Sequence, residues 1–92
     1  LLILYWRKKM KKTNDILSYV YDFLSMVFED ENLRYKIKSV ILFGSAAKGV
    51  YDSKSDVDLF FDIKNVEDKN QIEKDLKLVL KSFEIKTERT WR

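Results

Sequence analysis

The stretches VILFGS, at residues 40–45, and SDVDLF, at residues 55–60, decide how this chain folds. The apolar run that opens the first stretch predicts a buried strand, and Gly44 predicts the tight turn that ends it. In the second stretch charged and apolar residues alternate, which predicts a strand with one wet face. Because side chains two residues apart in a strand point the same way, Asp56 and Asp58 should share that face.

Each of these features suits one part of a phosphate-transfer site. The small residues Gly44 and Ser45 would let backbone N–H groups and a hydroxyl approach a triphosphate, helped by the positive end of a following helix. Asp56 and Asp58 offer hard oxygen ligands, which Mg²⁺ commonly uses together with substrate phosphates. A phosphate cradle beside a metal-holding pair indicates phosphoryl or nucleotidyl transfer.

The alternative is that Asp56, Asp58 and Asp62 form only the solvated face of a half-buried strand. Carboxylates crowded on one face repel one another, which destabilises the fold unless a cation or a basic partner offsets the repulsion. The Gly-Ser pair at the end of the preceding strand therefore favours a site. Asp62 by itself is expected to be solvated, and Phe60 is expected to lie under a helix rather than to support a nucleobase.

The rest of the chain predicts alternating helices and strands. The expected elements are a helix from Thr13 or Asn14 to the acidic stretch 29–32, a strand over 35–43, a short helix over 46–48, a strand over 57–63, a long helix after Asn65 and a strand over 83–88. This order, α-β-α-β-α-β, predicts an α/β (α+β) sandwich in which helices cover a small sheet.

The composition narrows the chemistry further. The 92 residues suffice for one domain, and the absence of cysteine and histidine excludes disulfides, thiol nucleophiles and the usual zinc ligands. Acid–base and metal chemistry must therefore fall to carboxylates, lysines or tyrosines. The formal net charge of +3 is too small for a dedicated nucleic-acid binder.

Residues 1–12 are predicted to be an N-terminal extension to a domain over 13–92. Their apolar part, residues 1–6, is too short to span a membrane, and it precedes the basic cluster at 7–12, unlike the order in a secretory signal. We interpret this segment as upstream or non-native sequence, as a partly ordered extension, or as an apolar patch for a partner. We expect a cytoplasmic chain without membrane or nucleic-acid partners, and the sequence leaves a homo-oligomer open.

The motif pair Phe43-Gly44-Ser45 and Ser55-Asp56-Val57-Asp58-Leu59 resembles that of the DNA polymerase beta nucleotidyltransferase superfamily, particularly its minimal nucleotidyltransferases. The family pattern is an apolar residue with Gly-Ser, a spacer, and then Asp-apolar-Asp/Glu-apolar. Ala46 stands where many small members have Arg, and Lys48 replaces a second Arg. The resemblance implies a nucleotidyltransferase-like sandwich with a small mixed β-sheet.

The resemblance also implies a set of metal-binding carboxylates. Asp56 and Asp58 would bind two Mg²⁺ ions, and a third carboxylate on the next strand would complete the site and deprotonate the attacking hydroxyl. Glu84, between Phe83 and Ile85, is the preferred candidate for this third carboxylate. Glu88, on the same face of that expected strand, stays open as the alternative.

The nucleotide and its acceptor follow from the same resemblance. Ser45 and the backbone N–H groups of Gly44 and Ser45 would bind the β- and γ-phosphates of an NTP, and Lys48 would add a point charge. The implied activity is transfer of a nucleoside monophosphate, AMP from ATP in the first place, to a hydroxyl. Small members of the family often work as antitoxins that adenylylate a HEPN-type helical toxin. The alternative is an interaction module that keeps the fold, partners such a helical protein and has little or no catalytic activity.

Overall fold

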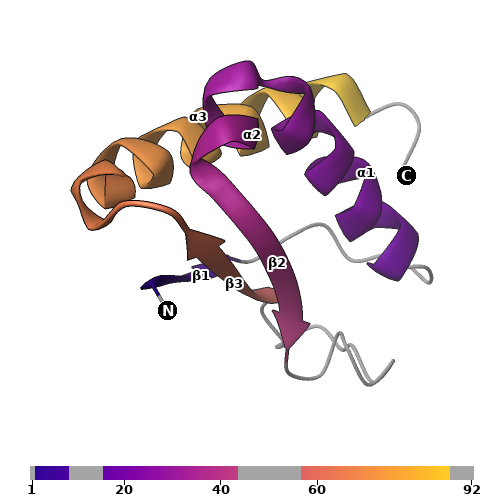
Figure 1. Cartoon of the computed structure of the whole chain (residues 1–92). Coiled ribbons are helices and arrows are strands. Elements are labelled where there is room, and N and C mark those ends of the chain that lie inside the picture. Colours follow the sequence, from indigo (N-terminus) through magenta and orange to yellow (C-terminus); the bar gives the residue numbers. More distant parts are fainter. Residues whose placement is uncertain (1, 9–15, 44–56, 88–92) are drawn as a thin grey trace.

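A three-stranded antiparallel sheet with helices on one side forms this protein, whose computed structural model describes residues 2–8, 16–43 and 57–87 (Figure 1). The sheet has the order β1-β3-β2, with β1 at Leu2–Lys8, β2 at Ile37–Phe43 and β3 at Val57–Ile63. The helices are α1 at Ile16–Glu29, α2 at Glu31–Lys36 and α3 at Lys69–Thr87, and the 3-10 turn η1 at Val66–Asp68 precedes α3. The predicted α+β class is confirmed, although every strand pair in the described ranges is antiparallel rather than mixed.

The central strand β3 has the alternation that its sequence predicted. Val57, Leu59, Phe61 and Ile63 are buried, and the residues between them are only half-buried. Since β3 is hydrogen-bonded to a neighbour on each side, its apolar face anchors the whole sheet against the helices. The predicted strand over 57–63 is therefore confirmed.

The core fills the space between the sheet and the helices with aliphatic and aromatic side chains. At its centre the ring of Trp6 stacks on that of Phe23, with ring centroids 5.3 Å apart. Phe83 packs at an angle against Tyr19, at 5.0 Å between centroids. The described core residues are Leu4, Trp6, Ile16, Tyr19, Val20, Phe23, Val27, Leu33, Ile37, Val57, Leu59, Phe61, Ile63, Ile72, Leu76, Leu80 and Phe83.

The acidic stretch after α1 both ends one helix and begins another. α1 ends at Glu29, and the side chain of Asp30 accepts a hydrogen bond from the backbone N–H of Leu33 at 3.2 Å, which caps α2. Residues 35 and 36 therefore belong to a helix, and β2 begins at Ile37 rather than at the predicted Tyr35. The start predicted at Thr13 or Asn14 lies outside the described residues.

An irregularity in β2 reverses which of its side chains face the core. The pairing of β2 with β3 shifts in register between Ile37 and Ser39. Ile37 is buried, but beyond the shift Val40 and Leu42 pack against the core, and Ile41 is 53% exposed on the other face. A regular alternation would place Ile37 and Ile41 on the same face, but a register shift in a strand moves later side chains to the opposite face.

The strand predicted over 83–88 is also wrong, because residues up to Thr87 continue α3. Ile72, Leu76, Leu80 and Phe83 are all buried at helical spacing, so the apolar stripe predicted for this helix extends one turn further. Ile85 is exposed, so the short alternation after Phe83 has no sheet to bury it. No helix in the described ranges is long and apolar enough to cross a membrane.

The segment predicted as an N-terminal extension supplies the third strand of the described sheet. β1 pairs with β3 in register from Leu2 opposite Ile63 to Lys8 opposite Val57. Its residues Leu4 and Trp6 are 1% and 2% exposed, on the face that the helices cover. The third strand of the described sheet is therefore β1, and not the strand that the sequence predicted over residues 83–88.

The other face of the sheet carries side chains from all three strands. We call it the open face, because the helices that the structure describes cover the opposite side (Figure 1). By strand register its residues are Ile3, Tyr5 and Arg7 of β1, Asp58, Phe60 and Asp62 of β3, and Ser39, Ile41 and Phe43 of β2. The open face therefore combines a carboxylate row with aromatic and aliphatic side chains.

Candidate active site

Asp58 lies on the open face near the start of the central strand. Its neighbours Val57 and Leu59 are buried in the core, so the alternation of β3 directs Asp58 away from the helices. Its side chain is only 16% exposed, because strands on both sides flank it. The sequence placed Asp58 on the wet face of this strand, and that placement is confirmed.

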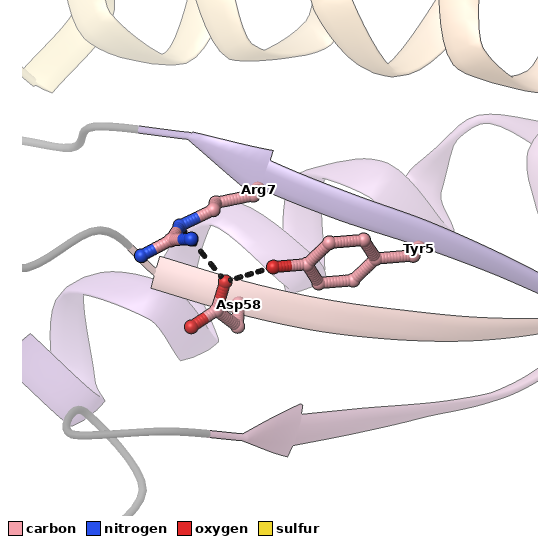
Figure 2. Close-up of polar contacts among 3 residues, drawn as sticks. All are labelled: Tyr5, Arg7 and Asp58. Carbon is pink, nitrogen blue, oxygen red and sulfur yellow. Dashed lines mark hydrogen bonds and ion pairs between the residues drawn. The ribbon is translucent and has the colours of Figure 1, made fainter.

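Two side chains of β1 converge on one oxygen of Asp58 (Figure 2). The hydroxyl of Tyr5 donates a hydrogen bond to Oδ1 at 2.7 Å. The Nε of Arg7 lies 3.3 Å from the same Oδ1 and forms an ion pair with it. The Asp58 carboxylate on the central strand is therefore held by one neutral donor and one cationic donor from the neighbouring strand.

The register of β1 explains why these two residues meet Asp58. Arg7 lies directly opposite Asp58, and Tyr5 lies opposite Phe60, one residue pair further along the same face. The ring of Tyr5 stacks on that of Phe60, with centroids 4.9 Å apart and planes at 25°. This stacking directs the phenol along the sheet surface towards Asp58, within reach of a diagonal cross-strand contact.

The contact with Asp58 affects the protonation of Tyr5. The hydrogen bond to the Asp58 carboxylate raises the pKa of Tyr5 above its ordinary value of 10.0, and desolvation adds to this in the same direction. The phenol is thus neutral and able to donate throughout the neutral pH range. Tyr5 acts here as a hydrogen-bond donor and not as a base.

Asp58 has the chemistry that a hard divalent cation requires. Both contacts that the structure describes for the Asp58 carboxylate, from Tyr5 and from Arg7, are made to Oδ1. In the ion pair with Asp58, the Arg7 side chain is 57% exposed while the carboxylate is only 16% exposed. The described residues contain no cluster of three metal-binding side chains, while Asp56 lies outside them. Asp58 therefore fits the role of one Mg²⁺ ligand.

The aromatic residues of the open face lie next to this carboxylate. Phe60 is half-buried between Tyr5 and Phe43, and it contacts the ring of Phe43 edge-on at 5.6 Å between centroids. The expectation that Phe60 lies under a helix is wrong, because the helices cover the alternate residues of β3. Phe43 is 61% exposed and lies opposite Asp58 on the β2 side.

Asp62 differs from the solvated residue that the sequence predicted. It is half-buried, and its Oδ1 is buried without a hydrogen-bond partner among the residues that the structure describes. It lies on the open face opposite Ile3 and Ser39, four residues along β3 from Asp58. A strand rises about 3.3 Å per residue, so Asp62 is too distant to share a ligand directly with Asp58.

The structure does not bring Glu84 to Asp58. Glu84 is exposed on α3, which packs on the helix-covered face, whereas Asp58 lies on the open face. The expected strand that would have carried Glu84 into the site is absent from the described chain, so this residue has no structural basis as the third carboxylate. Its alternative, Glu88, lies outside the described residues, as do the predicted phosphate-binding residues Gly44, Ser45 and Lys48.

Sequence reasoning missed Tyr5 and Arg7 because residues 1–12 were assigned to an extension. A weak signal was present: Leu4 and Trp6 alternate with Tyr5 and Arg7, and the segment is rich in residues favoured in strands. Leu2 and Ile3, however, are apolar on both faces, which hides the alternation. The basic cluster that follows also favoured a solvated tail.

Comparison with known families agrees with the motif and the fold. A family model described as a nucleotidyltransferase domain matches residues 26–91, well over half of the chain. The chain therefore belongs to the nucleotidyltransferase domain family, as expected for a minimal nucleotidyltransferase of the DNA polymerase beta superfamily. Comparison with curated proteins and with solved structures gives no significant match.

Proposed function

We propose that this chain is a cytoplasmic, Mg²⁺-dependent nucleotidyltransferase that moves AMP from ATP to a hydroxyl acceptor. The observation that carries the proposal is the family match over residues 26–91, which contains both the Gly-Ser pair and Asp58. The general activity of that family is nucleotidyl transfer. The Asp58 carboxylate on the open face is consistent with this activity.

The reaction assigns a distinct task to each group of residues. The acceptor oxygen attacks the α-phosphorus of ATP and forms a new P–O bond. The bond between the α-phosphorus and the oxygen that bridges to the β-phosphate breaks, and pyrophosphate leaves with the electron pair. The hydroxyl proton passes to solvent. Asp56 and Asp58 would hold the metal, while Gly44, Ser45 and Lys48 would bind the β- and γ-phosphates. Bound at these carboxylates, two Mg²⁺ ions would activate the hydroxyl and offset the charge that develops on pyrophosphate.

The acceptor we propose is a hydroxyl on a helical partner protein of the HEPN type, which the chain would adenylylate as an antitoxin. This part of the proposal depends on the resemblance of the Gly-Ser and Asp-Val-Asp motifs to those of minimal nucleotidyltransferases.

The test is transfer of label from each of the four NTPs, with Mg²⁺, to a HEPN-type protein and to small hydroxyl acceptors. We expect ATP to be the donor and Asp58→Asn to lower the rate at least about 100-fold, since metal-held charge stabilisation supplies several kcal/mol. The matched control is Asp22→Asn, which removes an exposed carboxylate from α1. Transfer by Asp58→Asn at the wild-type rate would contradict the proposal.

A second candidate is an interaction module with the same fold and little or no catalysis. The exposure of Ile41 and Phe43 on the open face favours it, because apolar side chains there would suit a protein partner. This candidate predicts that a double Asp56→Asn, Asp58→Asn variant keeps its affinity for the helical partner and its effect on it. If the chain is instead an enzyme, the same double variant should still bind the partner but should no longer modify it.

A further inference from the structure

The strand β1 lies outside the family-matched region, yet it supplies both described contacts to the Asp58 side chain. We propose that Tyr5 and Arg7 are positioning residues, which orient the Asp58 carboxylate so that Oδ2 faces the metal and nucleotide. This inference depends on the proposed function, because it assigns Asp58 to metal binding. On this inference, residues 2–8 contribute to the geometry of the candidate active site.

The geometry of the two contacts carries the inference. Both donors engage Oδ1, with Tyr5 at 2.7 Å and Arg7 Nε at 3.3 Å. A carboxylate with a single donor can still turn about its Cβ–Cγ bond, whereas two donors that approach one oxygen from different residues fix that rotation. Figure 2 shows the guanidinium and the phenol approaching Oδ1 from two directions, while the other carboxylate oxygen points away from the phenol. Ligands that are held in this way bind metals more tightly.

The two donors are themselves held in place by the core. Leu4 and Trp6 alternate with them along β1 and are almost completely buried, and Trp6 stacks on Phe23 of α1. The position of Tyr5 is fixed further by its ring contact with Phe60. Although Tyr5 and Arg7 are exposed, their backbone positions are thus set by buried neighbours, as a positioning role requires.

Two other roles for these contacts make different predictions. If the contacts served only to pair the strands, their loss would change stability and leave metal binding as it was. If β1 masked Asp58 instead, removing a donor would tighten metal binding. Orientation predicts the third result, weaker metal binding with little change in folding.

The experiment is a titration of the full chain with Mg²⁺ in the absence of nucleotide. Binding is monitored by NMR through the backbone amide resonances of residues 57–59. Tyr5→Phe keeps the stacked ring and removes only the hydroxyl, and Arg7→Lys keeps the charge and removes the Nε donor. We expect the Kd for Mg²⁺ to rise about 10-fold in Tyr5→Phe, the lower end of the range seen when outer partners of metal ligands are lost. The rise in Arg7→Lys should be smaller, because lysine keeps the charge. Tyr21→Phe and Arg34→Lys are matched controls on exposed helical positions and should leave the Kd unchanged.

An Asp58→Asn variant separates failure of this inference from failure of the proposed function. If Asp58→Asn abolishes Mg²⁺ binding while Tyr5→Phe and Arg7→Lys bind as the wild type does, the positioning role is overturned and the proposed function stands. Tighter binding in either β1 variant would overturn the inference in favour of masking. If the wild type binds no Mg²⁺, or if Asp58→Asn leaves binding unchanged, both the inference and the metal assignment to Asp58 fail.

Discussion

Replacing Leu4 by alanine should show whether β1 is part of the folded core. Leu4 is 1% exposed and lies opposite Phe61, beneath the helices. Leucine-to-alanine changes at buried sites cost about 2–5 kcal/mol, depending on how far the cavity collapses. Because β1 is an edge strand and can relax more easily than β3, we expect about 2–3 kcal/mol. For a domain of this size that corresponds to a fall in Tm of roughly 10–20 °C.

The assay is urea unfolding of the wild type and of Leu4→Ala, followed by tryptophan fluorescence and by circular dichroism. Leu78→Ala is the matched control, since Leu78 is 65% exposed on α3 and its replacement should change stability by no more than about 0.5 kcal/mol. Coincident transitions from the two probes would justify a two-state treatment. If Leu4→Ala is no more destabilising than Leu78→Ala, β1 does not contribute to the core and the reasoning is refuted.

Three further predictions follow from single side chains. Glu84→Gln should keep the rate of nucleotidyl transfer within about two-fold of the wild type, because Glu84 lies on the opposite side of the sheet from Asp58. A loss of rate comparable to that of Asp58→Asn in the same assay would contradict this placement. Asp58→Asn should lower the pKa of Tyr5 towards 10.0 in a ¹³Cζ NMR titration, because the hydrogen bond to this carboxylate is the main cause of the raised pKa. The stability that this hydrogen bond contributes is present below about pH 10 and is lost as pH rises through the raised pKa. An unchanged pKa in the variant would argue against the hydrogen bond. Asp30→Ala should lower the free energy of unfolding by about 1 kcal/mol, because it removes the side-chain cap of α2. Asp30→Asn should keep most of this stabilisation, since asparagine can also cap a helix. Equal losses of stability in the two variants would exclude capping as the cause.

The central part of the fold could be predicted because the apolar residues of each segment follow a single periodicity, that of a strand or that of a helix. The alternation of β3 and the helical spacing of Ile72, Leu76 and Leu80 in α3 each favour one structure, so the strand and the start of the helix were predicted correctly. The end of α3 was predicted wrongly because Phe83 and Ile85 also fit an alternation of period two. Phe83 packs against the rings of Tyr19 and Phe23 of α1, and these contacts are tertiary, so no local pattern specifies them.

The site could be predicted only from its central strand. Asp58 was identified from the motif, whereas its partners Tyr5 and Arg7 depend on a strand pairing that no local pattern specifies. The face of Ile41 depends on a register shift between Ile37 and Ser39, which a regular alternation cannot anticipate. Long-range pairing and local irregularity therefore account for what sequence reasoning missed.

The pairing of β1 with β3 also has a consequence for how the chain folds. Tyr5 and Asp58 are 53 residues apart, whereas Phe43 and Asp58, which pair between β2 and β3, are only 15 apart. The longer loop adds about 1 kcal/mol of closure entropy, so we expect β1 to dock onto a β2–β3 pair that has already formed. Asp58 would then acquire its two donors in the last stage of folding. Until β1 docks, Asp58 would lie on an edge strand without Tyr5 and Arg7, and only the complete fold would present an oriented carboxylate.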